Sequence, residues 1–269
     1  YSDYWGTRVQ AFELLEQHRE LSLTAESLVE VRATLSVPVP ASVGWEALPR
    51  AIERSTSLVD QLAATKLTAP PAEVAEKARE LAASASDPTA AAEAICTLVH
   101  ESVEYRPGAT TVSTTAAEAW QHRAGVCQDI AHLALGALRA AGIPARYVSG
   151  YLHPVVDAPL GETVIGESHA WVEWFDGVWR GYDPTNAIPI GERHVVVGRG
   201  RDYSDVPACG LQALRCSYRV GDPTRRRQGD SEIVTHYGIS GNIANTRDAH
   251  TGLSKDRRWG EPKVVGVNE

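Results

Sequence analysis

Three residues with complementary chemistry stand in suitable local settings: Cys127, His169 and Asp183. Cys127 directly precedes an apolar run that predicts a helix, and His169 lies in a stretch that predicts a strand. Asp183 ends a second predicted strand, just before Pro184. A thiol, an imidazole and a carboxylate can serve as nucleophile, base and orienting group in acyl transfer. Each residue alone is weak evidence, but the three together predict a catalytic site.

The helix that starts at Cys127 is predicted to run to about Ala141, because Gly142 and Pro144 are stop signals. In its first turn, unpaired backbone N–H groups and the helix dipole favour a thiolate over a thiol. The same N–H groups could stabilise an oxyanion formed by attack on a carbonyl. Gln121 is a further candidate donor, although a solvent-facing role is the simpler interpretation.

A tight turn is predicted between the strands that carry His169 and Asp183, because Asp176-Gly177 readily adopts positive φ angles. A turn centred on Asp176 would place His169 directly opposite Asp183, with the two side chains on one face about 5 Å apart. A two-residue loop would shift the register by one residue and separate them. The expected pairing therefore depends on the loop type.

The order of the predicted elements gives the fold class. Helices are predicted from Pro71 to Ala83, from Asp87-Pro88 onward, and through Trp120, the last one started by the capping-box pair Thr115 and Glu118. Beyond the Cys127 helix, strands are predicted at 145–151, 168–174 and 178–183. Helices followed by an antiparallel sheet indicate an α+β fold.

Four motifs resemble those of a known family: Gly125-Val126-Cys127-Gln128-Asp129, Gly142-Ile143-Pro144-Ala145-Arg146-Tyr147-Val148-Ser149-Gly150-Tyr151, Glu167-Ser168-His169-Ala170-Trp171 and Asp183-Pro184-Thr185-Asn186. With these motifs the chain resembles the bacterial transglutaminase-like family, most specifically from about Ser113 to Pro207. The resemblance implies a papain/transglutaminase-like core, with the nucleophile Cys127 at the start of a helix packed on an antiparallel sheet. It also implies His169 as base, Asp183 as orienting group, and acyl transfer on amides. Whether water or an amine accepts the acyl group stays open.

The chain of 269 residues divides into three expected parts. Residues 1–50 are expected to be a truncated β-rich N-terminal region, because apolar residues alternate as a strand at Leu21, Leu23, Ala25, Val29 and Val31 and because this region resembles the end of the β-rich part that precedes the core. Residues 51–207 are expected to form the transglutaminase-like catalytic domain. Residues 208–269 lose apolar periodicity, so we expect an aberrant or disordered tail. Within it, Cys209, Cys216 and His236 could be considered zinc ligands, but their spacing matches no tight metal knuckle.

Other residues near the three candidates have two interpretations each. Trp171 and Trp174 could line a substrate cleft, although Trp on a half-buried strand is usually part of the core. Asp129 and His132 are one helical turn apart and could bond each other. The loop-like stretch 152–166 precedes His169 and could border the cleft.

Composition limits the partners. A net charge of −8 argues against nucleic acid or an anionic membrane as the main partner, and no apolar run approaches the ~20 residues of a membrane helix. Four Cys make no disulfide framework, so a cytoplasmic protein with reduced thiols is favoured. The chain contains no Met and begins at Tyr1, so we expect a missing N-terminus, with which a signal peptide could have been lost.

These observations predict a cysteine-dependent amide hydrolase or acyltransferase that acts on a peptide or protein through a thioester. Hydrolysis is favoured over cross-linking, and the chemistry requires no metal or organic cofactor. The alternative is a non-catalytic binding or scaffold module, or an inactive fragment that retains the fold. The complete set of Cys127, His169 and Asp183 favours the enzyme, while the truncated start and the tail favour the alternative.

Overall fold

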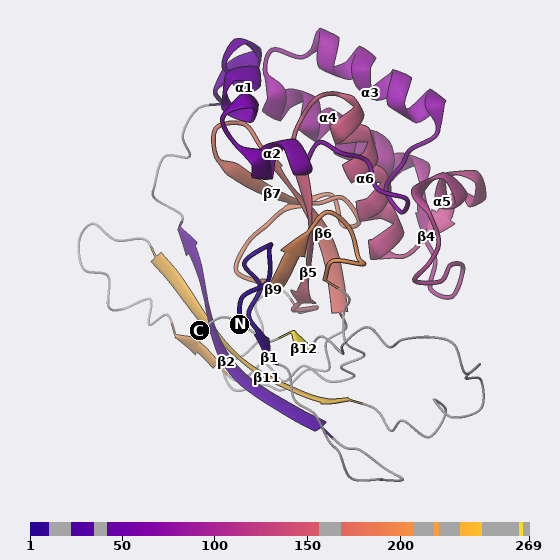
Figure 1. Ribbon diagram of the computed structural model, residues 1–269. Coiled ribbons are helices and arrows are strands. Elements are labelled where there is room, and N and C mark those ends of the chain that lie inside the picture. Colours follow the sequence, from indigo (N-terminus) through magenta and orange to yellow (C-terminus); the bar gives the residue numbers. More distant parts are fainter. Residues whose placement is uncertain are drawn as a thin grey trace, which may run out of the picture.

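The computed structural model describes residues 1–10, 23–34, 42–155, 168–206, 218–220, 232–243 and 264–265. Its helices are α1 (Gly44–Glu53), α2 (Thr56–Asp60), α3 (Ala72–Ser84), α4 (Pro88–Ser102), α5 (Ala116–His122) and α6 (Cys127–Ala140). The helices gather on one side of an antiparallel sheet, and two long strands lie at the opposite end of the molecule (Figure 1). The predicted α+β class is therefore confirmed.

The central sheet has five antiparallel strands in the order β8-β7-β6-β5-β9. They are β5 (Ala145–Leu152), β6 (Ser168–Phe175), β7 (Trp179–Asp183), β8 (Ile188–Pro189) and β9 (His194–Gly200). The first three match the predicted strands. The pairing of β5 with β9 shifts between Ser149 and Gly150, which marks a bulge there. A short parallel pair, β3 (Glu104–Tyr105) with β4 (Ala124–Gly125), leads the chain into α6.

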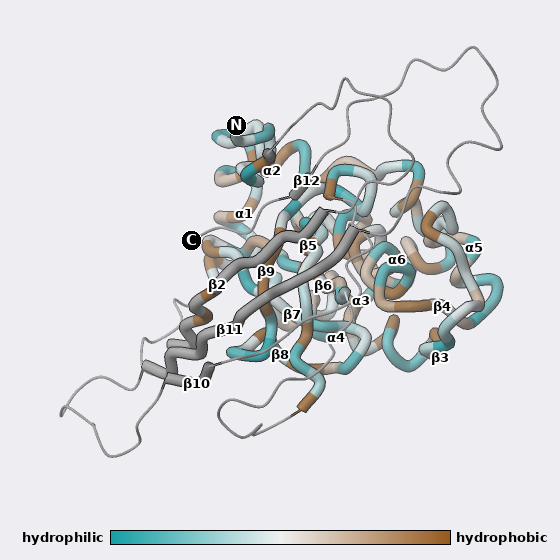
Figure 2. The backbone as a smooth tube through the Cα atoms, turned by 90° about the horizontal axis from the view of Figure 1, so that it is seen from below, coloured by the Kyte–Doolittle hydropathy of each residue, from teal (hydrophilic) through white to brown (hydrophobic). Residues whose placement is uncertain are grey.

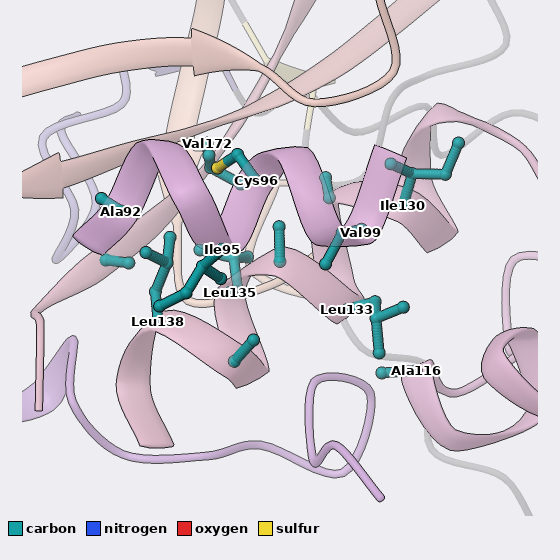
Figure 3. Close-up of a cluster of buried hydrophobic side chains, with 14 of the residues drawn as sticks. Ala92, Ile95, Cys96, Val99, Ala116, Ile130, Leu133, Leu135, Leu138 and Val172 are labelled. Carbon is teal, nitrogen blue, oxygen red and sulfur yellow. The ribbon is translucent and has the colours of Figure 1, made fainter. Parts of the chain in front are cut away.

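Helix α6 is the centre of the hydrophobic core. It packs on β5 and β6 and is covered by α3, α4 and α5. Apolar side chains from α4, α6 and β6 share one buried cluster, which includes Cys96, Leu135 and Val172 (Figure 3). Hydrophilic residues instead mark the outer turns of the chain near α5 and β3 (Figure 2). Cys96 has no exposed surface, in agreement with its interpretation as a small core residue.

Two of the predicted helix starts, those of α4 and α5, are confirmed by their caps. The Asp87 side chain accepts from the Ala90 N–H at 3.0 Å, with Pro88 in the first turn of α4. Thr115 and Glu118 form the reciprocal capping box of α5. These contacts satisfy N–H groups that have no partner inside a helix, so each cap fixes where its helix begins.

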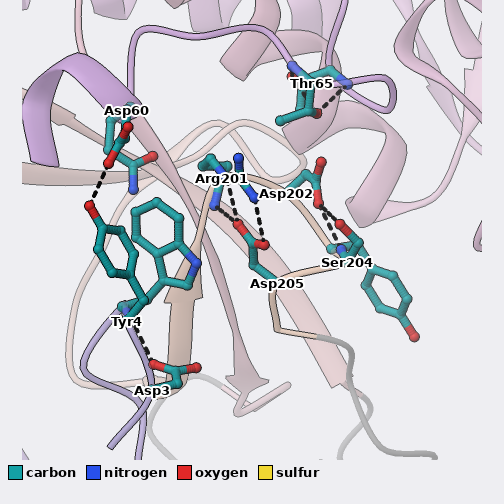
Figure 4. Close-up of polar contacts among 12 residues, drawn as sticks. Asp3, Tyr4, Asp60, Thr65, Arg201, Asp202, Ser204 and Asp205 are labelled. Carbon is teal, nitrogen blue, oxygen red and sulfur yellow. Dashed lines mark hydrogen bonds and ion pairs between the residues drawn. The ribbon is translucent and has the colours of Figure 1, made fainter. Parts of the chain in front are cut away.

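The first ten residues are tied to the core by polar contacts (Figure 4). Tyr4 Oη donates to Asp60 Oδ2 at the end of α2, at 2.6 Å. The Arg201 guanidinium lies over the Trp5 ring and forms a forked ion pair with Asp205. The amino-terminal segment therefore contacts both α2 and the segment that follows β9.

Three strands are described within residues 208–269, for which an aberrant or disordered tail is predicted. Strand β11 (Glu232–Ile243) pairs antiparallel with β2 (Leu23–Thr34) along their whole length, and β10 (Tyr218–Val220) pairs with β11. Strand β12 (Val264–Val265) pairs with β1 (Val9–Gln10). The cause is backbone pairing, since β11 supplies the N–H and C=O partners that β2 would otherwise lack. The boundaries of the three expected parts remain predictions.

Gly136 of α6 provides a test of how closely the helix packs. A Cβ at this position would lie 2.0 Å from the Thr68 carbonyl oxygen and 2.9 Å from Pro70 Cδ. We expect Gly136→Ala to lower the free energy of unfolding by about 1–3 kcal/mol, although Ala is normally the better helix former by up to about 1 kcal/mol. Urea denaturation measures the change. Gly191→Ala is the control, because a Cβ there meets nothing within 4 Å; equal stability of both variants would contradict the close packing.

Candidate active site

Cys127 is the first residue of α6, as predicted. The segment that leads into α6 is held in place because the Val126 N–H donates to Asp129 Oδ2 at 2.8 Å. Gly125 is needed before this turn, since a Cβ there would lie 2.7 Å from Asp129 Cβ. The N–H groups of Asp129 and Ile130 both donate to the Val126 carbonyl. The Cys127 N–H lies two positions before the Asp129 N–H, at the helix end where backbone donors have no intrahelical partner.

The first turn of α6 also holds the preceding loop in place. Thr110 Oγ1 donates to Asp129 Oδ2 at 2.5 Å, and Gln128 Nε2 donates to the Val112 carbonyl at 3.0 Å. Burial raises the pKa of Asp129, while the hydrogen bonds from Thr110 and the Val126 N–H oppose that shift. The segment between β3 and α5 is thus fixed next to Cys127.

The suggested bond between Asp129 and His132 is wrong. Asp129 Oδ2 is occupied by Thr110 and Val126, and His132 Nε2 accepts from the Tyr203 N–H at 3.1 Å. Burial lowers the pKa of His132 to about 4, so this imidazole is neutral at pH 7. The two residues serve different contacts, one at the helix start and one in the core.

His169 and Asp183 are in direct contact. His169 Nε2 lies 2.7 Å from Asp183 Oδ2, and the Asp183 side chain has no exposed surface. Asp183 Oδ1 accepts from the backbone N–H groups of Thr185 and Asn186, at 2.9 and 3.2 Å. Burial by itself raises the pKa of Asp183, but the hydrogen bond and charge of His169, the nearby His194 imidazole and the Asn186 amide outweigh it and hold the pKa well below its usual range. The buried carboxylate is therefore charged at neutral pH.

The register that brings His169 and Asp183 together differs from the expected one. Phe175 pairs with Trp179, so the loop consists of three residues centred on Gly177 rather than on Asp176. Gly177 takes a φ of 108°, which favours glycine. In this register the residue across from Asp183 on β6 is Trp171, not His169. Because the shift is even, His169 and Asp183 stay on one face and meet diagonally.

Cys127 completes the group on the other side of the imidazole. Burial lowers the pKa of His169, but hydrogen bonds to Asp183 and Cys127, together with their charges, raise it to about 9. Since Nε2 is bonded to Asp183, Nδ1 is the ring nitrogen left for Cys127. A protonated imidazole therefore lies beside a half-buried thiol at the start of a helix. The structure thus brings all three predicted residues together; their catalytic roles remain a prediction.

The remaining candidates divide into three groups. Gln121 is exposed on α5, while Trp171 and Trp174 are 0% and 2% exposed and belong to the interior, not to a cleft wall. Residues 156–167, Cys209 and Cys216 lie outside the described residues, as does the side chain of His236. Across the part of the chain that the structure describes, no helix is long and apolar enough to cross a membrane.

Two further side chains reach the Asp183 carboxylate. Asn186 Nδ2 donates to Oδ2 at 2.7 Å and lies 3.5 Å from His169 Nε2. His194 Nε2 lies 3.5 Å from the same oxygen. Asn186 stands in a motif already quoted for the family resemblance, so its position next to Asp183-Pro184 was a usable signal. His194 gave no such signal, because only the pairing of β9 with β5 brings it near.

Known proteins are similar to this chain in sequence. The model of the transglutaminase-like superfamily matches residues 75–184. An uncharacterized protein of Mycobacterium leprae is 41% identical over 220 residues, covering 80% of this chain and 76% of that protein. An uncharacterized protein of Mycobacterium tuberculosis is 38% identical over 224 residues, covering 76% and 68%. The chain belongs to the transglutaminase-like superfamily.

Two other proteins are more distantly similar. A protein-glutamine gamma-glutamyltransferase of Pseudomonas aeruginosa is 31% identical over 125 residues, which is 42% of this chain and 19% of that protein. The solved structure of a Cytophaga hutchinsonii protein, provisionally described as a cysteine protease, superposes with a TM-score of 0.52 at 19% identity. That match covers 94% of this chain and 86% of the other, and it shows a common fold.

We expect the two described cysteines to differ in reactivity. Cys127 is half-buried beside a protonated His169, whereas burial raises the pKa of the Cys96 thiol and leaves it no exposed surface. We expect iodoacetamide to label Cys127 rapidly near pH 6 in the native protein and to label Cys96 only after denaturation. Mass spectrometry reads each site separately, with Cys127→Ala as control. Equal labelling of the two thiols in the native state would contradict the pairing of Cys127 with His169.

The bond to Asp183 predicts how His169 titrates. Its pKa of about 9 depends on the hydrogen bond and charge of Asp183. In Asp183→Asn we expect the titration of His169 to fall toward the unperturbed value of about 6.5. NMR of histidine-labelled protein measures this, with His169→Asn identifying the signal. A titration of His169 that stays at its original pH in Asp183→Asn would refute the coupling.

Proposed function

We propose that this protein is a cysteine-dependent enzyme that cleaves amide bonds of a peptide or protein substrate through a thioester on Cys127. The observation that carries the proposal is the contact of Cys127 with His169, which the buried charge of Asp183 holds in place. A thiol at a helix start beside an oriented imidazole is the arrangement that an activated nucleophile needs. Membership in the transglutaminase-like superfamily supports the same chemistry.

The first half of the reaction forms the thioester. The Cys127 thiolate attacks the amide carbonyl carbon, and the electron pair of the C=O bond moves to the oxygen. The Cys127 N–H at the start of α6 is the donor best placed to stabilise this oxyanion. His169 then gives its proton to the leaving nitrogen, the C–N bond breaks, and the amine departs. Asp183 stabilises the imidazolium throughout this step.

The second half decides between hydrolysis and transfer. Water or an amine attacks the thioester, His169 accepts the proton of the nucleophile, and the Cys127 thiolate leaves. We favour water, because hydrolysis needs no second binding site, whereas transfer requires an amine to bind in preference to water. Transfer is the second candidate, since part of the chain is similar to a protein-glutamine gamma-glutamyltransferase. The cytoplasm is the proposed compartment, because a catalytic thiol must remain reduced.

The test uses casein as a substrate together with a fluorescent primary amine. New peptide termini or released ammonia, without fluorescent product, are expected for a hydrolase, and an acid quench should trap an acyl group on Cys127. Cys127→Ala should lower the rate by about 10⁴-fold or more while the fold is retained, because only the thiol at the start of α6 is removed.

The other outcomes are equally distinct. Incorporation of the amine that requires Cys127 would identify an acyltransferase instead of a hydrolase. A rate in Cys127→Ala equal to that of the wild type would refute the nucleophile. Binding of casein without any Cys127-dependent product would favour the scaffold module.

A further inference from the structure

His194 is a buried histidine outside the predicted set. It is the first residue of β9 and lies beyond the segment that the family model matches. Its side chain is 2% exposed, and β9 is held in place by pairing with β5, where His194 is opposite Leu152. A buried imidazole requires a partner for each ring nitrogen, so its two contacts define its role.

The protonation of His194 follows from its backbone contact. The Gly191 N–H donates to Nδ1 at 3.2 Å, so Nδ1 acts as an acceptor. A neutral imidazole that accepts at one nitrogen carries its proton on the other. Nε2 is therefore a donor. Within the described residues it makes no regular hydrogen bond, and it lies 3.5 Å from Asp183 Oδ2.

The carboxylate oxygen that faces His194 is the one that binds His169. Asp183 Oδ2 is 2.7 Å from His169 Nε2, and the two imidazole rings have centroids 6.4 Å apart. Trp171 packs against both rings, at centroid distances of 6.2 Å to His169 and 5.3 Å to His194. This packing depends on Gly150, since a Cβ there would lie 2.5 Å from Trp171 Cη2. Both imidazoles are thus held against one oxygen.

We propose that His194 is a positioning residue, whose Nε2–H holds Asp183 Oδ2 in the orientation that binds His169. The inference rests on the proposed function, because it assigns His194 a role only through Asp183 and His169. As a neutral donor, His194 stabilises the carboxylate charge without competing for the proton that His169 needs. Hydrogen bonds of this kind are often long without substrate and shorten in the reacting complex, in agreement with the 3.5 Å separation.

A packing role can be separated from a positioning role by two substitutions. His194→Phe keeps a ring beside Trp171 but removes the donor, whereas His194→Gln keeps an N–H donor at a similar reach. His132→Gln is the matched control, because His132 is also fully buried but contacts the Tyr203 N–H instead of Asp183. If His194→Phe does not fold, His194→Asn, whose amide is too short to reach Asp183, takes its place.

The experiment measures the His169 titration by NMR and the rate of Cys127 alkylation by iodoacetamide at pH 7. In His194→Phe we expect the titration to fall from about 9 by about one pH unit or more, and alkylation to be slower than in the wild type. His194→Gln should stay within about threefold of the wild-type rate. His132→Gln should lower the stability of the protein but change neither the His169 titration nor the rate of Cys127 alkylation.

Two results would overturn the inference: an unchanged His169 titration and alkylation rate in the donor-free variant, or equal defects in His194→Gln and His194→Phe. Failure of the proposed function looks different. In that case the wild-type Cys127 itself reacts like an ordinary free thiol, and casein shows no Cys127-dependent product, regardless of the residue at position 194.

Discussion

A negative charge buried at Asp183 is the constraint on which the site depends. A carboxylate without exposed surface is costly unless hydrogen bonds and an opposite charge compensate it. Here the Thr185 and Asn186 backbones bind one oxygen, and His169 with the Asn186 amide binds the other. The next residue is also anchored, since His100 of α4 contacts the Pro184 carbonyl at 3.1 Å. Satisfying this charge therefore fixes strand, loop and helix relative to one another.

The position of Cys127 depends instead on close backbone packing. Gly136 brings α6 against the Thr68 backbone, and Gly125 lets Asp129 reach back to the helix start. At the other end of the helix, Arg139 donates to the carbonyls of Gln61, Ala145 and Arg201. Burial lowers the pKa of Arg139 to about 10, yet it remains charged at neutral pH. The helix that presents the thiol is thus fixed at both ends.

The sequence allowed the local part of this arrangement to be predicted. Caps and stop signals located α4, α5 and α6, and they placed Cys127 at a helix start, because these signals act within one or two turns. The contact of His169 with Asp183 was predicted from a loop centred on Asp176. The loop is centred on Gly177 instead, and the two residues stay on one face of the sheet only because the register differs by an even number of residues.

Contacts between distant segments could not be predicted in this way. The pairing of β11 with β2 joins residues from opposite ends of the chain, and His194 reaches Asp183 only through the pairing of β9 with β5. Neither contact leaves a periodicity or spacing in its own neighbourhood. A single sequence gives the hydrogen-bonding capacity of such strands but not their partners.

The pairing of β5 with β9 also bears on which part of the chain could be exchanged between proteins as a unit. The region matched by the family model ends at Pro184, inside the turn that holds the carboxylate. A protein that acquired only this region by recombination would have the thiol, the imidazole and the carboxylate. It would also have β5 as an open sheet edge, with no strand to pair Tyr147–Leu152 and no cover for Trp171. The smallest heritable module that keeps the site enclosed therefore extends through Gly200.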